Sequence, residues 1–133
     1  MSTFLMQVRH IMSSPVITIQ ENDSVLKAIK KMVDKDIECL VVPAADKRVS
    51  GILTFRDMVE KVLLLERPPQ HTRVREIMTR KVKTCHSTAT VGEVVKLMKK
   101  YRLRRIPVVD ARERLVGIIT NFDLACLGLE VST

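Results

Sequence analysis

The sequence predicts an α/β (α+β) fold made of two similar βαββα repeats that pack sheet to sheet. One observation is a phrase that occurs twice: residues 51–57 read GILTFRD, and residues 117–123 read GIITNFD. The other is the alignment of residues 8–59 with residues 74–125, in which sixteen of 52 positions are identical without a gap. The chain therefore contains an internal duplication with an offset of 66 residues.

The first repeat shows the patterns of a strand, a helix, two strands and a second helix. A short β-branched run is typical of a strand. The capping residue Ser24 is followed by apolar residues at helical spacing. Two further apolar runs flank a polar turn, and the second helix has Met58, Val59, Val62 and Leu63 on one face. The predicted elements are strands at 16–19, 40–42 and 49–53, and helices at 25–33 and from Thr54.

The second repeat shows the same order of patterns. A linker at 66–71 contains a proline pair, which ends the preceding helix. About 60 residues bury only a modest core, so we expect two domains, at 1–66 and 67–133, that bury each other's sheet faces and enclose two equivalent clefts. The predicted elements of the second repeat are strands at 82–85, 106–109 and 115–119, and helices at 91–101 and from Thr120.

Composition excludes several classes of protein. Apolar residues make up 46% of the 133 residues, which is ordinary for a folded domain. No apolar run approaches the roughly 20 residues that span a membrane. The three cysteines, Cys39, Cys85 and Cys126, include no CxxC pair, so we expect neither a disulfide framework nor a metal site. These features predict a cytoplasmic protein with no membrane association.

The positive charge lies in the second half of the chain. Residues 1–66 contain nine Lys or Arg and nine Asp or Glu, whereas residues 67–133 contain fourteen and six. The second half therefore carries the whole net charge of +8. Such a surface attracts anions, which include phosphorylated ligands, nucleic acids and acidic proteins.

The repeated phrase places a threonine and an aspartate three residues apart at the start of a helix. In each copy, Thr54 with Asp57 and Thr120 with Asp123, this spacing is that of a capping box, which stabilises a helix. The same hydroxyl and carboxylate, beside free N–H groups, could also hold the two vicinal hydroxyls of a ribose. The motif by itself leaves both interpretations open.

The whole pattern resembles a tandem pair of CBS (cystathionine β-synthase) domains, also called a Bateman module. The resemblance covers nearly all of residues 8–128, and the order and duplication of its motifs are specific. It implies a regulatory module, not an enzyme, that requires no cofactor and binds AMP, ADP, ATP or S-adenosylmethionine as a regulatory ligand. The matching segments are HIMSSPVIT at 10–18, EIMTRKVKT at 76–84, RIPVVD at 105–110 and the two phrases GILTFRD and GIITNFD.

The resemblance also implies which residues bind the ligand. In the family the aspartate of the motif holds the ribose, the threonine assists, apolar side chains hold the adenine, and basic residues of one repeat bind the phosphates of a ligand in the other repeat's cleft. The first cleft would use Thr54, Asp57, Val16, Ile17, Ile37, Arg104 and Arg105. The second, expected to bind more weakly, would use Thr120, Asp123, Val82, Lys83 and Leu103, because Glu38 stands where the first cleft receives Arg104.

Two alternatives to a ligand-binding module remain. The arginines at 102–114 could bind nucleic acid, although aromatic stacking residues are scarce. The apolar helix ends at 62–65 and 124–127 could instead serve a ligand-free interaction module. Family members pair through such helices, so we expect a homodimer that regulates a separate, unidentified protein. No glycine-rich phosphate loop, nucleophile elbow or HExxH motif occurs, so we do not expect catalysis.

Overall fold

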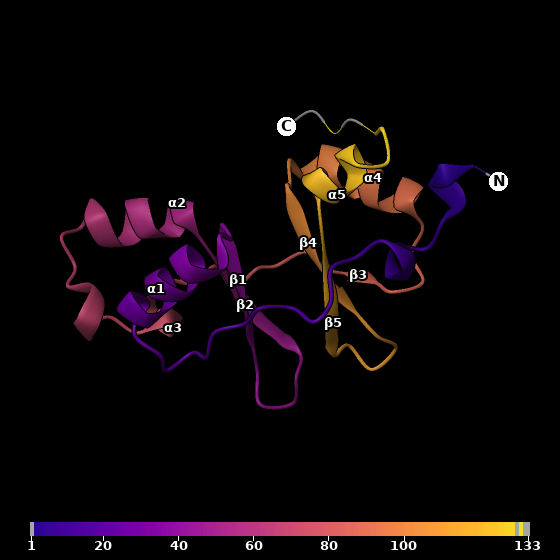
Figure 1. Cartoon of the computed structure of the whole chain (residues 1–133). Coiled ribbons are helices and arrows are strands. Elements are labelled where there is room, and N and C mark those ends of the chain that lie inside the picture. Colours follow the sequence, from indigo (N-terminus) through magenta and orange to yellow (C-terminus); the bar gives the residue numbers. More distant parts are fainter. Residues whose placement is uncertain (1, 130, 132–133) are drawn as a thin grey trace. The chain divides into compact units, whose positions relative to one another are not determined.

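The computed structural model describes residues 2–129 and 131, which form a mixed α+β fold with two small sheets (Figure 1). The chain divides into two compact units. Residues 17–82 form one of them, which we call the continuous unit. Residues 1–16 and 83–133 form the other, which we call the split unit.

The continuous unit contains a two-stranded antiparallel sheet and several helices. Ser24 caps the first helix by accepting a hydrogen bond from the N–H of Lys27 (3.1 Å). This first helix ends where Asp36 adopts a left-handed conformation (φ 53°). The elements are α1 Val25–Lys35, β1 Cys39–Pro43, β2 Val49–Thr54, α2 Phe55–Met58, the π-helix η3 Val59–Leu63, the 3-10 helix η4 Pro69–His71 and α3 Val74–Ile77.

The split unit repeats this arrangement with one more strand. Thr90 and Glu93 form a capping box at the start of the long helix, which ends where Arg102 is left-handed (φ 55°). The elements are the 3-10 helices η1 Thr3–Leu5 and η2 Val8–His10, then β3 Cys85–His86, α4 Val91–Tyr101, β4 Arg105–Val109, β5 Leu115–Thr120 and α5 Asn121–Ala125.

The hairpins of the two units have the same register. Val41 pairs with Ile52 in β1 and β2, and Pro107 pairs with Ile118 in β4 and β5. β3 adds a parallel strand beside β4. The strand expected at residues 16–19 is reduced to a single parallel bridge between Thr18 and Val41. Two hydrogen bonds form this bridge, from the Ile19 N–H to the Val41 carbonyl at 3.1 Å and from the Val41 N–H to the Ile17 carbonyl at 3.5 Å.

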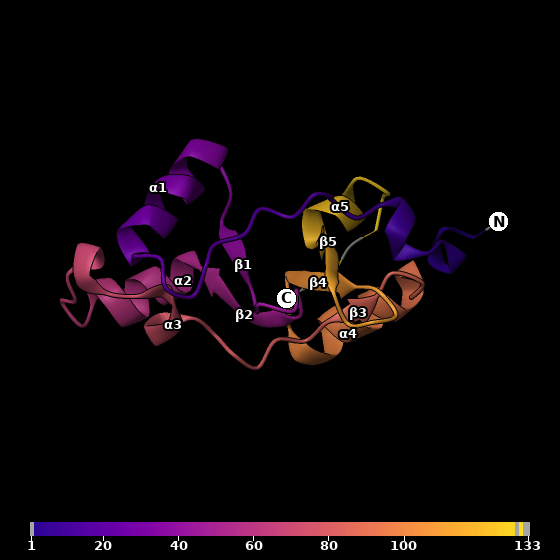
Figure 2. The same ribbon diagram turned by 90° about the horizontal axis from the view of Figure 1, so that it is seen from below.

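Each unit includes one segment from the other sequence repeat. Residues 67–82 complete the continuous unit, where Thr79 and Ile52 exchange two backbone hydrogen bonds of 2.9 Å. Residues 1–16 do the same in the split unit, where Ser13 and Ile118 exchange bonds of 2.9 and 3.1 Å. Figures 1 and 2 show this indigo N-terminal segment against the orange and yellow elements. The compact units therefore have different bounds from the expected domains at 1–66 and 67–133, which remain a prediction as sequence repeats.

A separate apolar core lies in each unit. α1 buries Val25, Ala28 and Met32, but Val33, expected on the same face, is 70% exposed. After α2 the π-helix changes the angular spacing of side chains. Met58 and Val62 are buried, whereas Val59 and Leu63, also expected on the buried face, are 47% and 68% exposed. No helix among the described residues is long and apolar enough to cross a membrane.

Candidate functional site

The Thr54–Asp57 motif joins β2 to α2 as a complete capping box. The Asp57 N–H donates to the Thr54 hydroxyl oxygen at 3.3 Å. Asp57 Oδ2 accepts from the Thr54 N–H at 2.9 Å and from the Thr54 hydroxyl at 3.2 Å. These three bonds hold the carboxylate in one orientation at the end of the hairpin.

The second carboxylate oxygen of Asp57 also has partners in the continuous unit. Lys61 Nζ lies 2.9 Å from Asp57 Oδ1, and the Thr79 hydroxyl donates to the same oxygen at 3.2 Å. Lys61 Nζ also donates to the carbonyl of Ile77 at 2.9 Å. Asp57 is only 6% exposed, and a buried charge needs partners within the fold. Lys61 and Thr79 provide them.

The Thr120–Asp123 motif at the start of α5 forms the same capping box. Asp123 Oδ2 accepts from the Thr120 N–H at 2.8 Å and from the Thr120 hydroxyl at 3.0 Å. The Asp123 N–H donates to the Thr120 hydroxyl oxygen at 3.2 Å. No hydrogen bond or ion pair to Asp123 Oδ1 is found within residues 2–129 and 131. Asp123 is half-buried, so its side chain is accessible in part to a donor from outside the described residues.

Different residues at corresponding positions of the two repeats explain this difference between the motifs. Leu127 stands at the position that corresponds to Lys61, and its side chain cannot pair with a carboxylate. Ser13 corresponds to Thr79 and makes the equivalent backbone bridge, but no bond from its hydroxyl to Asp123 is found in the described part of the chain. The two motifs thus share one backbone geometry and differ in side-chain partners.

The predicted apolar contacts are divided between the two units. Ile17 and Ile37 are half-buried against the core of the continuous unit, which also contains Thr54 and Asp57. Leu103 is half-buried against the core of the split unit, which contains Thr120 and Asp123. Val16 and Val82 are half-buried at the ends of the segments where the units meet in sequence.

The predicted basic residues all belong to the split unit. The carbonyl of Arg104 accepts a 2.8 Å hydrogen bond from the Asn121 N–H, so its backbone lies at the start of α5. Arg104 is exposed, and Arg105, the first residue of β4, is half-buried. Lys83 Nζ lies 4.3 Å from the centre of the Tyr101 ring, a cation–π distance. Lys83 therefore already has a partner other than the Thr120–Asp123 motif.

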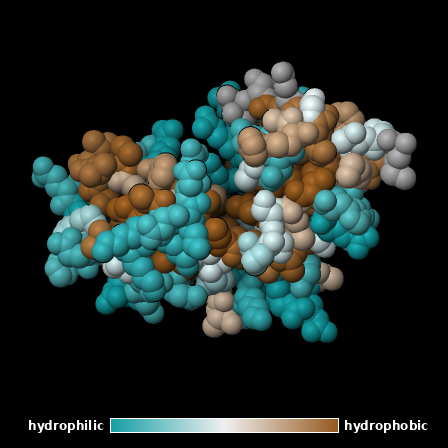
Figure 3. Space-filling model, in the orientation of Figure 1, coloured by the Kyte–Doolittle hydropathy of each residue, from teal (hydrophilic) through white to brown (hydrophobic). Residues whose placement is uncertain are grey.

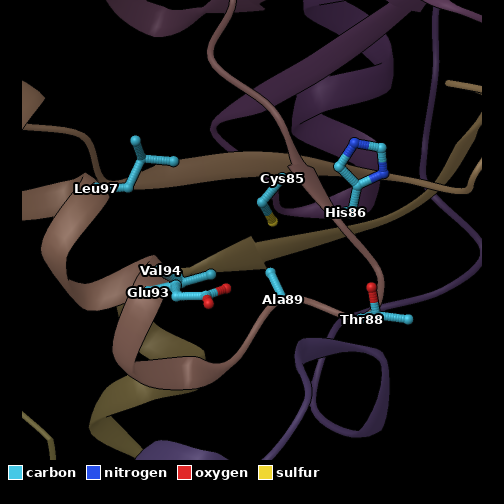
Figure 4. A pocket seen from close by; sticks show the side chains of 7 residues that line it. All are labelled: Cys85, His86, Thr88, Ala89, Glu93, Val94 and Leu97. Atoms are coloured by element: carbon cyan, nitrogen blue, oxygen red, sulfur yellow. The ribbon is translucent and has the colours of Figure 1, made fainter.

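A pocket of about 490 Å³ lies in the split unit between β3 and α4 and contains none of the predicted site residues (Figure 4). The Cys85 sulfur and the Glu93 carboxylate face the same space. Burial, together with the nearby Glu93 charge, raises the pKa of the Cys85 thiol to about 11. The thiol is therefore protonated at neutral pH, which makes it a poor nucleophile. The lining residues are Cys85, His86, Thr88, Ala89, Glu93, Val94 and Leu97.

Metal ligands are not grouped in the part of the chain that the structure describes. Among those residues no group of three or more His, Cys, Asp or Glu side chains could hold an ion. His86 Nε2 lies 3.2 Å from a carboxylate oxygen of Glu113, and this contact is an ion pair only when the histidine is protonated.

Sequence reasoning missed Lys61 and Thr79. Lys61 lies four residues after Asp57, and an i, i+4 pair of opposite charge is a signal that the sequence contained. Thr79 lies 22 residues from Asp57, and no local pattern could have revealed that contact.

Comparisons with known proteins identify the repeats. The CBS domain family matches residues 8–64 and 74–127. Hypoxic response protein 1 of Mycobacterium tuberculosis is 32% identical over 117 residues, which are 88% of this chain and 81% of that protein. L-aspartate semialdehyde sulfurtransferase of Methanocaldococcus jannaschii is 33% identical over 120 residues, 90% of this chain but only 23% of that protein.

A solved structure extends the similarity to the three-dimensional fold. The CBS domain pair of protein MJ0100, in complex with 5′-methylthioadenosine and S-adenosyl-L-methionine, superposes with a TM-score of 0.83. The sequence identity is 34%, and the match covers 93% of this chain and 96% of that chain.

Proposed function

The chain belongs to the CBS domain family, and we propose that it is a regulatory module that binds an adenosine-containing ligand through its Thr-x-x-Asp motifs. The supporting observation is that both aspartates are held in the same orientation by complete capping boxes. An oriented carboxylate suits the two hydroxyls of a ribose because each carboxylate oxygen can accept two hydrogen bonds. The complex of the MJ0100 pair with two adenosyl compounds supports this class of ligand.

The rest of the ligand would contact the remaining predicted residues. Half-buried apolar side chains offer surface for an adenine: Ile17 and Ile37 in one unit and Leu103 in the other. AMP, ADP, ATP and S-adenosylmethionine are the candidates. The binding of phosphate oxygens by Arg104 and Arg105 stays a prediction, supported by the match between guanidinium groups and phosphates.

A regulatory role accounts better for the chain than a catalytic one. The relative that is named as a sulfurtransferase is matched over 23% of its length, so its activity does not transfer to this chain. We propose that ligand binding changes the affinity for a separate protein, which requires a different ligand affinity in each of two states.

The three cysteines are free thiols, which supports a reducing compartment such as the cytoplasm.

An exposed apolar surface supports a homodimer. In Figure 3 brown atoms gather over the helical segment that begins with α2. Val59, Leu63, Leu64 and Leu65 are between 47% and 71% exposed. Large exposed apolar side chains that lie together favour an interface, and we propose that a second copy covers them. Sedimentation velocity of the wild type and of Leu64→Glu tests this proposal, since a monomeric wild type would contradict it.

Thermal unfolding with a panel of compounds tests the ligand. The panel is AMP, ADP, ATP, S-adenosylmethionine, 5′-methylthioadenosine and adenosine, with GTP as a control. A ligand at 100 times its Kd stabilises the folded state by about 2.7 kcal/mol, which raises Tm by several degrees. We expect adenosyl compounds alone to raise Tm. If none does, the proposal fails, and salt-dependent binding to RNA and DNA becomes the next test because the second half of the chain is basic.

A further inference from the structure

We infer that Lys61 and Thr79 act as an internal lock on Asp57, so that ribose hydroxyls bind first at Asp123. The inference rests on the proposed function and adds a difference between the two motifs. It reverses the order of affinity expected from the sequence, in which the motif of Asp57 was the stronger site. Arg104 and Arg105 favour the site of Asp57 for phosphates, whereas the contacts already made by the two carboxylates favour the site of Asp123 for ribose hydroxyls.

The carboxylate of Asp57 has no acceptor position left. An ionised carboxylate offers about four lone-pair positions, two on each oxygen. On Asp57 Oδ2 the Thr54 N–H and hydroxyl fill two of them, at 2.9 and 3.2 Å. On Oδ1 the Lys61 ammonium and the Thr79 hydroxyl fill the others, at 2.9 and 3.2 Å. A ribose hydroxyl must therefore displace one of these donors before it can bind.

Displacement at Asp57 has a cost because the lock is itself well held. Lys61 Nζ bonds to both Asp57 Oδ1 and the Ile77 carbonyl. The Asp57 side chain is 8% exposed, so water cannot readily replace a lost donor. The Lys61 side chain is 39% exposed, however, which leaves it a path to swing outward when a ligand arrives.

Within the described part of the chain, the carboxylate of Asp123 has two acceptor positions open. Its Oδ2 accepts the same two bonds from Thr120, at 2.8 and 3.0 Å. Its Oδ1 has no donor within the described residues, where Leu127 replaces the lysine. Two vicinal hydroxyls could therefore bind this carboxylate without breaking a bond of the fold.

Calorimetric titration with adenosine tests the inference, because an uncharged nucleoside separates hydroxyl binding from phosphate binding. We expect Asp123→Asn to weaken the tighter site about tenfold or more, since bonds to a charged acceptor are lost. Asp57→Asn should leave that site within about twofold. Lys61→Met should tighten or reveal a second site, and the matched exchange Leu127→Lys should weaken the first. The reverse ranking, with Asp57→Asn abolishing the tighter site, would overturn the inference.

A measurement without ligand separates this inference from the proposed function. In a double-mutant cycle, Tm is measured for Asp57→Asn, Lys61→Met and the double variant. The lock predicts that the two decreases in Tm are not additive, because each change removes the same contact. Additive decreases would show that no lock exists. If no adenosyl compound binds the wild-type protein, the proposed function fails, and the cycle still decides whether Lys61 contacts Asp57.

Discussion

Gly51 in β2 lies so close to Met78 that a Cβ atom at residue 51 would be 2.8 Å from the methionine sulfur. It would also lie 2.9 Å from the backbone carbonyl of Thr79. Gly117 has the same relationship with Met12, whose sulfur would be 2.3 Å from the added Cβ. The glycine of the repeated phrase is therefore required by the segment that each unit takes from the other repeat.

Substitution of these glycines should destabilise the fold to different degrees. Gly51→Ala must move a backbone carbonyl, and we expect it to lower the free energy of unfolding by about 1–3 kcal/mol in urea denaturation. At residue 117 all three nearest atoms belong to the Met12 side chain. Met12→Ala should therefore restore much of the loss caused by Gly117→Ala. Equal rescue of Gly51→Ala by Met78→Ala would contradict the role of the Thr79 carbonyl.

The aspartates should contribute unequally to stability. Asp57→Asn leaves the Lys61 ammonium without its carboxylate, and we expect a loss of about 1.5–3 kcal/mol in the free energy of unfolding. Asp123→Asn removes no ion pair found in the described chain and should cost less than about 1 kcal/mol. Chemical denaturation measures the free energy of unfolding of both variants. Equal losses would contradict the difference in contacts between Asp57 and Asp123.

The Cys85 thiol should be unreactive at neutral pH. Its pKa is raised to about 11, mainly by burial, whereas Cys126 is exposed. With iodoacetamide at pH 7.5, followed by mass spectrometry of peptides, Cys126 should be modified much faster than Cys85. Rapid modification of Cys85 in the folded protein would contradict its burial.

The same thiol should make stability depend on alkaline pH. Its pKa in the folded state, about 11, is above the ordinary value of 9.0, so between these values the folded state binds more protons than the unfolded state. Below pH 9 the thiol is protonated in both states and does not reduce the free energy of unfolding. As the pH rises from 9 toward 11, the free energy of unfolding falls because the unfolded state loses its proton first. We expect Cys85→Ala to show a smaller decrease than wild type over this window.

Removal of the N-terminal segment should expose one unit and spare the other. The Ile118 N–H donates to the Ser13 carbonyl at 3.1 Å, and the Ile52 N–H donates to the Thr79 carbonyl at 2.9 Å. After deletion of residues 2–15, hydrogen exchange at the Ile118 amide should become much faster. The Ile52 amide is the internal control and should remain protected. Loss of protection at both amides would contradict this prediction, because it would show that the N-terminal segment also stabilises the continuous unit.

Local patterns were enough to predict most elements. The helices at 25–35 and 91–101 follow from capping residues and apolar spacing, and the strands from short β-branched runs. The strand expected at 16–19 is only a bridge between Thr18 and Val41, and its extent depends on pairing with residues that are distant in the chain. The π-helix at 59–63 was also missed, since the sequence pattern there is compatible with an ordinary helix.

The sequence by itself determined the duplication, the family, the order of the long helices and hairpins and the two Thr-x-x-Asp motifs, because each depends on residues close together in the chain or on comparison of one half with the other. Only the tertiary structure decided that residues 1–16 and 67–82 each complete the unit of the other repeat. It also decided that Thr79 joins Lys61 at Asp57, whereas one oxygen of Asp123 has no donor among the residues that the structure describes. These contacts depend on the path of the chain, which brings together side chains that no local spacing relates.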